Sequence, residues 1–361
     1  MPARPGRSSS INGLDEPISS EDDDMPFHRR DIIAGGAAVI AAGALPSLSS
    51  RAVAATAARP VDLFSRHLQW LRSAEELAVA CHAMGFDGLD ITVRPFPGHV
   101  DPARVAQDLP PLVKALRAAN VGVRTITAPI ADAASPHAEA ILETAASLGI
   151  HHYWWGGLRY DLSSPIAPQR KALAPRIAGI ARLGEKYGMK AMYHNFSGAQ
   201  QVGSMIFDLL DILQDFDPRY VSFHYDTAHG VEAGANGTWP LGLKAIGPYL
   251  GGISFKDVLL TDKPAAAGEG GPPVSGRWRP AFVPLGEGML DLPRMVQILG
   301  EIGFDGPIEL QPEFPNGGAD RGVSKASDLT LPQETIFRNM AKDLQTLRLA
   351  LAGGTAPAPS K

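Results

Sequence analysis

The sequence contains one cysteine in 361 residues, Cys81, so no intramolecular disulfide can form and packing must stabilise the fold. Cys81 falls in a predicted helix, where we expect a buried structural thiol. Charge of one sign is not in large excess either, because 33 Lys and Arg stand against 38 Asp and Glu. With a formal net charge of −5 and no basic cluster in the body of the chain, the sequence argues against a nucleic-acid-binding surface.

An Ala- and Gly-rich run at residues 32–45 is too short and too weakly hydrophobic for a comfortable membrane span of about 20 residues. It follows Arg29-Arg30 and precedes Ala-Val-Ala at 52–54, an A-x-A cleavage pattern. The paired arginines resemble a twin-arginine (Tat) export signal, a route for folded proteins. We predict that residues 1–58 form a leader with a Tat-type signal peptide. The mature protein is then expected to be periplasmic or secreted, without a stable membrane span.

The acidic stretch at 21–24 is unusual in such a leader, so both Met1 and Met25 are candidate starts. A disordered tail and an uncleaved anchor are alternatives for this segment. In each case residues 1–58 lie outside the predicted fold.

After this leader, short apolar strands alternate eight times with amphipathic helices. The predicted strands are Leu63–His67, Gly88–Val93, Gly122–Thr127, His151–Trp155, Lys190–His194, Tyr220–Asp226, Gly252–Lys256 and Pro307–Gln311. The helices between them include Ser73–Met84, Pro168–Tyr187, Ser204–Gln214 and Leu292–Ile302. Such alternation is typical of parallel strands, and eight repeats indicate a closed barrel.

We therefore expect the α/β class and a single-domain (β/α)8 barrel of the TIM type at residues 59–352, followed by a flexible tail at 353–361. A doubly wound sheet is the alternative, but the sequence lacks the Gly-rich phosphate fingerprint that would support it. Ser73 and Glu76 form a capping box at the start of one helix. Residues 259–284, rich in Gly and Pro, are predicted to form one long loop, of a length found in functional lids.

Polar side chains gather at the C-terminal ends of the predicted strands, where this fold builds its active sites. Strand alternation determines which of them share a face. Ionised groups on strands that helices cover cannot be hidden on either face without cost, so we interpret them as a site. Strand five contributes His194 and the following Asn195, and strand six contributes His224 and Asp226, with His229 just beyond its end. Strand seven contributes Ser254 and Lys256, and strand eight contributes Glu309 and Gln311, with Glu313 just beyond its end.

Several of these residues also carry a family resemblance. The segments concerned are Leu63–Trp70, Tyr193-His194-Asn195, Tyr225–His229, Phe255-Lys256-Asp257, Pro284–Gly288 and Gly303–Glu313. In this order they resemble the sugar phosphate isomerase/epimerase family of the xylose isomerase-like TIM barrel superfamily. The resemblance extends over nearly all of residues 61–350.

The resemblance implies one divalent metal held by Glu, Asp, His and Glu from strands five to eight. Such a metal polarises a sugar carbonyl while side chains move a proton at the adjacent carbon. Asp226 stands at the position of the Asp, and His194 at that of the first Glu, which still allows a ligand. Ser254 stands in place of the His and Gln311 in place of the last Glu, and both are poor ligands. His229 matches a histidine that usually contacts substrate.

Two kinds of catalytic site therefore remain open. One is a modified site for Mn, Mg, Co or Zn, whose ligands would be His194, Asp226 and His224. The other is metal-free and transfers protons through the catalytic residues Lys256, His229 and Glu313. In either case Lys256 is suited to neutralise an enediolate or to hold a carboxylate.

Further residues are predicted to bind substrate. They are Arg94, Asn195, Trp155 and Glu309. Aromatic side chains near the barrel mouth stack on sugar rings, although packing explains Trp155 equally well. His151-His152 open strand four at the far end of the barrel and are interpreted as structural.

The expected function is an exported sugar isomerase or epimerase that moves a proton next to a carbonyl of a carbohydrate or keto-sugar. A lyase or dehydratase acting on an oxidised sugar is one alternative. Another is a non-catalytic periplasmic carbohydrate-binding barrel, which Ser254 and Gln311 favour. An abasic-site endonuclease would need a richer metal cluster and a basic groove. A small-molecule sugar is thus the expected partner, nucleic acid is not, and homo-oligomer formation stays open.

Overall fold

The computed structural model describes residues 59–263 and 276–354. The predicted leader at 1–58 and most of the predicted tail at 353–361 lie outside the described residues, so both stay predictions. No helix among the described residues is long and apolar enough to cross a membrane.

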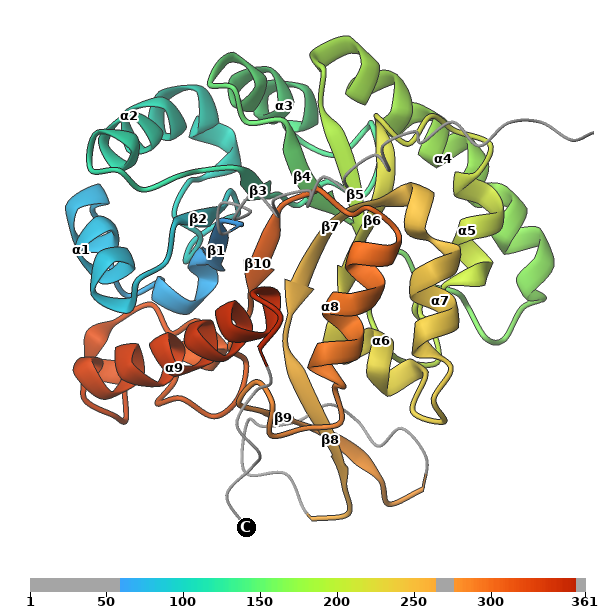
Figure 1. Cartoon of the computed structure of the whole chain (residues 1–361). Coiled ribbons are helices and arrows are strands. Elements are labelled where there is room, and N and C mark those ends of the chain that lie inside the picture. The colour runs from blue at the N-terminus through green and yellow to red at the C-terminus, as the bar shows by residue number, and fades with distance from the viewer. Residues whose placement is uncertain (1–58, 264–275, 355–361) are drawn as a thin grey trace, which may run out of the picture. The chain divides into compact units, whose positions relative to one another are not determined.

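Eight parallel strands form a closed barrel (Figure 1), in the order β1-β10-β7-β6-β5-β4-β3-β2. The barrel strands are β1 (Val61–Phe64), β2 (Gly88–Thr92), β3 (Thr125–Thr127), β4 (His152–Trp155), β5 (Lys190–His194), β6 (Val221–Asp226), β7 (Leu250–Phe255) and β10 (Ile308–Leu310). Because β1 pairs with both β2 and β10, the first and last strands of the chain complete the barrel. The predicted α/β barrel is thereby confirmed.

Helices surround the barrel, and their apolar faces cover the outer faces of the strands (Figure 1). They are α1 (Ala74–Met84), α2 (Val105–Ala118), α3 (Ala138–Ser147), α4 (Ile166–Tyr187), α5 (Phe207–Leu213), α6 (Thr227–Ala233), α7 (Trp239–Ala245), α8 (Leu292–Glu301) and α9 (Gln333–Leu351). The predicted capping box is present at α1, where Ser73 Oγ accepts from the backbone N–H of Glu76 and the Glu76 carboxylate accepts from that of Ser73. The Cys81 thiol is fully buried in the core, as expected.

Two differences from the predicted elements lie close to the C-terminal ends of the barrel strands. β1 ends at Phe64, three residues before the predicted His67, because the chain turns at Ser65–Leu68 into a short 3-10 helix. Backbone carbonyls of Asp320 and Arg321 bind the Arg66 guanidinium and hold this turn.

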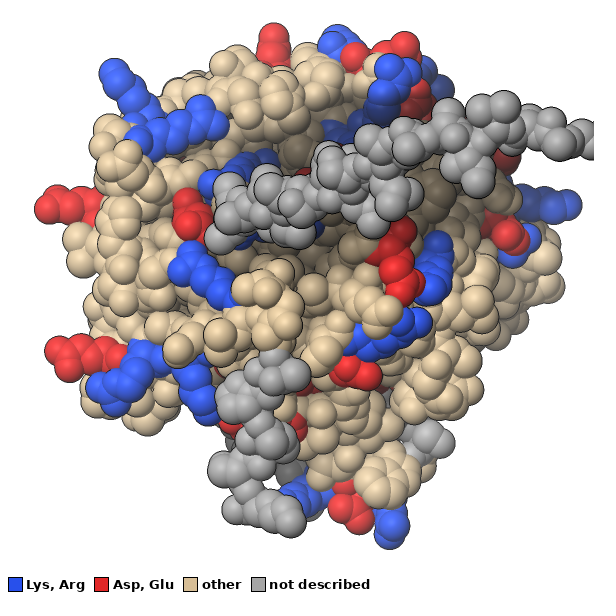
Figure 2. Space-filling view, viewed as in Figure 1, with Lys and Arg blue, Asp and Glu red and all other residues tan. Residues whose placement is uncertain are grey.

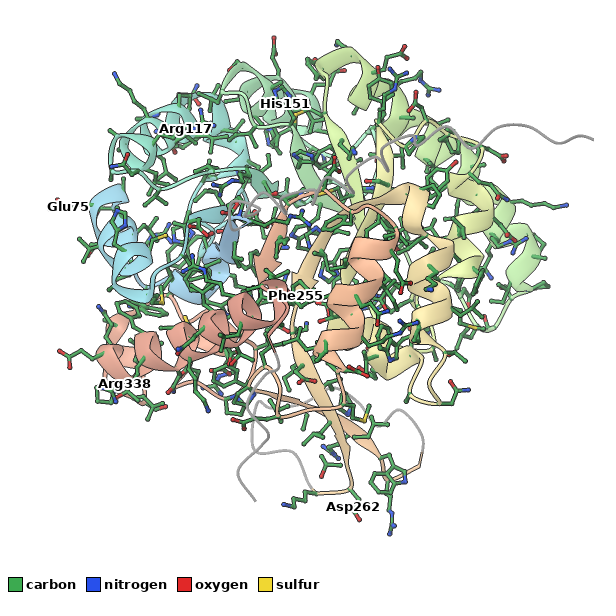
Figure 3. The ribbon with its side chains drawn as sticks, in the orientation of Figure 1. Glu75, Arg117, His151, Phe255, Asp262 and Arg338 are labelled. Carbon is green, nitrogen blue, oxygen red and sulfur yellow. The ribbon has the colours of Figure 1, made fainter. Side chains whose placement is uncertain are left out.

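The second difference concerns the predicted loop at 259–284. Its described parts belong to an antiparallel hairpin of β8 (Asp257–Thr261) and β9 (Arg279–Val283). Figure 3 shows Asp262, next to the end of β8, well outside the ring of helices. The hairpin therefore begins directly after the end of β7 and extends away from the barrel.

The surface carries charges of both signs. In Figure 2, Lys and Arg side chains are interspersed with Asp and Glu around the visible face. This mixture agrees with the small net charge of the sequence.

Candidate functional site

A pocket of about 300 Å³ lies at the C-terminal ends of the barrel strands. Of the residues that the sequence singled out, the ones that line it are Arg94, His194, His229, Lys256, Gln311 and Glu313. Four further residues line the pocket and were not among the predicted site residues: Phe64, Arg66, Trp154 and Phe196. The pocket is thus cationic and aromatic, with Glu313 as its lining carboxylate.

Lys256 occupies the centre of the polar side of this pocket. Its Nζ lies 3.0 Å from Asp226 Oδ2 and 2.8 Å from Glu313 Oε2, and its side chain is only 2 % exposed. A buried ammonium is costly unless carboxylates and hydrogen bonds replace its water, and two carboxylates do so at this position. Thr227 fixes the backbone of Lys256, since its hydroxyl donates to the Lys256 carbonyl and accepts from the N–H.

These ion pairs set the protonation states. Burial would lower the pKa of Lys256, but Asp226 and Glu313 outweigh it and raise this pKa above its usual value. Burial acts in the opposite direction on the carboxylates. The charges of Lys256 and Arg66 nevertheless lower the pKa of Glu313 to about 2, and Lys256 holds the pKa of Asp226 well below its ordinary range. At neutral pH the three groups are therefore ionised.

His229 completes this cluster from the first turn of α6. Its Nε2 lies 3.4 Å from Lys256 Nζ, and because an ammonium only donates, Nε2 must be the unprotonated nitrogen. The proton is then on Nδ1, which donates to Ser197 Oγ at 2.9 Å, while the Ser197 hydroxyl donates to Glu232 Oε2 at 2.7 Å. Burial and the charge of Lys256 lower the pKa of His229 to about 3, so its imidazole is neutral at pH 7.

Asp226 links the barrel to α6. Its carboxylate Oδ1 accepts from the backbone N–H of His229, which caps α6 and fixes His229 relative to Lys256. Asn195 holds the end of β6, because its Oδ1 accepts from the Asp226 N–H at 2.7 Å and its Nδ2 donates to the Asp226 carbonyl. Asn195 is 1 % exposed and does not line the pocket, so its position does not support the predicted contact with substrate.

The hairpin contributes an aromatic side chain to the site. The Lys256 Nζ lies 4.5 Å from the centre of the Phe282 ring of β9, within the range of a cation–π contact. Asp257, the next residue, is buried, and its carboxylate accepts from the backbone N–H groups of Gly286, Gly288 and Leu290. The segment that follows β9 is thereby fixed to the end of the barrel, beside Lys256.

Strand alternation places Trp154, and not the predicted Trp155, at the pocket. Trp155 is fully buried and packs against Tyr193 of the neighbouring strand, with ring centres 4.9 Å apart. Trp154 lies on the other face of β4, beside His194 at 4.9 Å. The position of Trp155 does not support the predicted contact with substrate, and Trp154 lines the pocket instead, because successive side chains of a strand point to opposite faces.

Glu309 lies inside the barrel, below the pocket. Its Oε1 accepts from the Gln311 side-chain amide, while burial and the neighbouring Asp90 raise the pKa of Glu309 well above its usual value. A protonated Glu309 donates to Asp90, and this explains why Glu309 Oε2 and Asp90 Oδ1 are buried with no other partner among the described residues. The predicted substrate contact of Glu309 is therefore not supported, since Gln311 and Asp90 engage its carboxyl group.

The described residues do not fit the divalent metal that the family resemblance implies. His194 Nε2 is 3.5 Å from Asp226 Oδ2, but the Lys256 ammonium already lies against the same oxygen and would repel a second cation. His224 is deeper in the barrel, where its Nε2 contacts Ser254 Oγ at 3.0 Å. The described residues contain no group of three or more His, Cys, Asp and Glu side chains arranged to hold a metal. The predicted ligand set of His194, Asp226 and His224 is therefore not supported.

Solved structures of sugar epimerases have a similar fold. The D-psicose 3-epimerase of Clostridium cellulolyticum H10, with D-tagatose, superposes at a TM-score of 0.57 with 14 % identity, covering 81 % of this chain and 99 % of that chain. For the 3-keto-D-glucoside 4-epimerase of E. coli the TM-score is 0.56 with 12 % identity, covering 80 % and 99 %. For the IOLI protein with a bound zinc atom it is 0.58 with 15 % identity, covering 80 % and 98 %.

At these identities the superpositions show a shared fold. No curated protein matches the sequence significantly. The profile of the xylose isomerase-like TIM barrel family matches residues 78–329, a range that includes every barrel strand except β1. The chain therefore belongs to the xylose isomerase-like TIM barrel family.

Proposed function

We propose that this protein is a sugar isomerase or epimerase in which the Lys256 ammonium takes the role of a divalent cation. The observation that carries the proposal is the position of Lys256 Nζ between Asp226 and Glu313, beside the unprotonated nitrogen of His229. Solved structures of similar fold are described as sugar epimerases, and one structure of similar fold holds a zinc atom. In this chain the site has an amino group where a metal would otherwise supply positive charge.

Proton transfer beside a carbonyl needs positive charge at the oxygen that becomes an enolate or enediolate. The Lys256 ammonium donates to Glu313, forms an ion pair with Asp226, and makes only a long, 3.4 Å contact to His229 Nε2. A substrate oxygen can replace this contact at little cost. Lys256 then stabilises the oxygen, and His229 Nε2 is released as a base for the adjacent C–H.

His229 becomes a stronger base during this step. Its pKa is low because of burial and the positive charge of Lys256. Negative charge developing on a substrate oxygen next to Lys256 offsets that positive charge and favours protonation of His229. The Ser197 hydroxyl accepts from His229 Nδ1 and donates to the Glu232 carboxylate, and this chain of hydrogen bonds stabilises the resulting imidazolium.

Aromatic side chains suit a sugar in this pocket. Phe64, Trp154 and Phe196 line it, and they offer apolar faces on which the C–H side of a sugar ring can stack. Phe282 shields Lys256 from water, which strengthens its interaction with a substrate oxygen.

Hydrogen–deuterium exchange tests the proposal for isomerisation and epimerisation alike. The purified protein is incubated in D2O with a panel of 2-keto and 3-keto sugars, and deuterium at carbons next to the carbonyl is measured by NMR. We expect enzyme-dependent exchange in at least one sugar. Because Lys256 supplies the positive charge, prior treatment with EDTA should leave the exchange rate unchanged.

Three results would contradict the proposal. Loss of exchange on EDTA treatment, with recovery on adding Zn²⁺ or Mn²⁺, would show that a metal supplies the charge. Saturable sugar binding without exchange or product formation would identify a carbohydrate-binding barrel instead, while loss of water from an oxidised sugar would identify a dehydratase.

We further propose export of the protein, on the grounds of Arg29-Arg30 and the cleavage pattern at 52–54. N-terminal sequencing of the mature protein should then find Ala55 as the first residue. A mature chain that retains Arg29-Arg30 would contradict cleavage at this place.

A further inference from the structure

Arg94 is a cation of the pocket that lacks an acidic partner. It lies two residues beyond the end of β2 and is only partly exposed. Its guanidinium carbon lies 4.6 Å from the ring centre of Trp154 and 5.7 Å from that of Phe64. Among the described residues no ion pair or side-chain hydrogen bond to Arg94 is found, so its five N–H donors are available to a ligand.

The other two cations of the pocket are matched. Lys256 pairs with Asp226 and Glu313, and Arg66 donates to Glu313 Oε1 at 3.0 Å and to two backbone carbonyls. Of the three cations that line the pocket, Arg94 is thus the one for which no ion pair is found among the described residues. Leaving an arginine in this state, between two aromatic rings and away from bulk water, costs free energy unless a ligand repays it.

The buried carboxyl pair below the pocket does not provide this partner. Asp90 accepts from the Thr127 hydroxyl at 2.6 Å and from the protonated Glu309. It acts on Arg94 only through space. The guanidinium of Arg94 lies over the Trp154 ring, and its N–H groups remain free for an acceptor with two oxygens, since no hydrogen bond from the Arg94 side chain is found among the described residues.

We propose that Arg94 binds an anionic group of the substrate, so that the substrate is an acidic sugar. The inference rests on the proposed function and specifies its substrate class. Because the ionised Glu313 lines the same pocket and the buried Asp90 acts on Arg94 through space, a carboxylate with its single negative charge suits the pocket better than the dianion of a phosphate ester. The guanidinium fork pairs with either group in two parallel hydrogen bonds.

A series of ligands with one carbon skeleton tests this assignment. D-Fructose, D-fructuronate and D-fructose 6-phosphate differ at carbon six, which carries a hydroxyl, a carboxylate or a phosphate. Their binding to the full chain is measured by titration calorimetry, which needs no turnover and so separates this proposal from the proposed function. We expect the carboxylate ligand to bind most tightly. Replacing Arg94 with glutamine should weaken its binding by about 10- to 100-fold and leave D-fructose binding unchanged.

Further variants and outcomes decide the matter. Arg94→Lys should recover part of the affinity, because it restores the charge but not the fork. The control is Arg104→Gln, an exposed arginine that pairs with Asp108, and it should change no affinity. If D-fructose 6-phosphate binds most tightly and Arg94→Gln abolishes this preference, Arg94 binds an anionic group, but that group is a phosphate and the assignment to an acidic sugar is overturned. Equal binding of the neutral and acidic ligands, or an unchanged affinity in a folded Arg94→Gln variant, would overturn the proposal.

Discussion

Replacing Lys256 with methionine is expected to lower kcat/KM by about 100- to 1000-fold, the loss seen when one donor to a developing oxyanion is removed. Methionine keeps most of the length and apolar surface of the side chain but not the ammonium. Asp226, which is fully buried, then loses the partner that lies 3.0 Å away. An unpaired buried carboxylate destabilises a protein strongly, so the free energy of unfolding should also fall by about 3–5 kcal/mol.

A second substitution separates these two effects. In Lys256→Met/Asp226→Asn the buried charge is gone, and part of the lost stability should return in urea unfolding, while the activity stays low. Lys244→Met is the matched control, because Lys244 forms an exposed pair with Glu301 at 2.6 Å. Exposed pairs contribute about 0–1 kcal/mol, so this variant should stay active and almost as stable as the wild type. A folded Lys256→Met protein with activity within about 10-fold of the wild type would contradict the role of the ammonium.

The barrel was predictable because its signals are local. Alternating strands and helices and the capping box at Ser73 each depend on a few neighbouring residues, and the structure has all of them. Alternation also placed His224 and Asp226 on the same face of β6, where the former contacts Ser254 and the latter Lys256. At β4 the sequence offers three consecutive aromatic residues, and the predicted Trp155 lies on the buried face rather than at the pocket. Its neighbour Trp154 had the correct phase.

Contacts between distant segments explain what the sequence did not predict. Arg66 and Glu313 are 247 residues apart and meet because β1 and β10 are neighbours in the closed barrel. Phe282 reaches Lys256 because β9 returns along β8, in a segment whose Gly and Pro content indicated a loop. Whether Lys256 or a metal lies beside Asp226 depends on side-chain direction, which the order of residues alone does not give. Glu232, in contrast, follows His229 by three residues on one helix and was accessible to sequence reasoning.

His229→Gln is expected to lower kcat by about 100- to 10 000-fold, since glutamine can fill the space and accept a hydrogen bond but cannot take up a proton. The exposed His82 provides the control, and His82→Gln should retain wild-type activity. In the wild type, His229 should cause no acid limb of kcat/KM near pH 6.5, because burial and Lys256 lower its pKa to about 3. Turnover of a folded His229→Gln variant at the wild-type rate would contradict its role as the base.

The same lowered pKa links His229 to stability, with a sign that unfolding experiments can check. An unfolded histidine binds a proton below about pH 6.5, whereas the folded His229 stays neutral until about pH 3. Between these values the unfolded state binds more protons, so the contribution of His229 to stability is complete above pH 6.5 and is lost as the pH falls. At pH 5 the loss amounts to about 2 kcal/mol relative to pH 8. Glutamine does not titrate. The difference in unfolding free energy between wild type and His229→Gln should therefore shift by this amount in favour of the variant between pH 8 and pH 5. A pH-independent difference would show that His229 titrates in the folded protein as it does in the unfolded chain, and a shift in favour of the wild type would show that it is protonated in the folded protein.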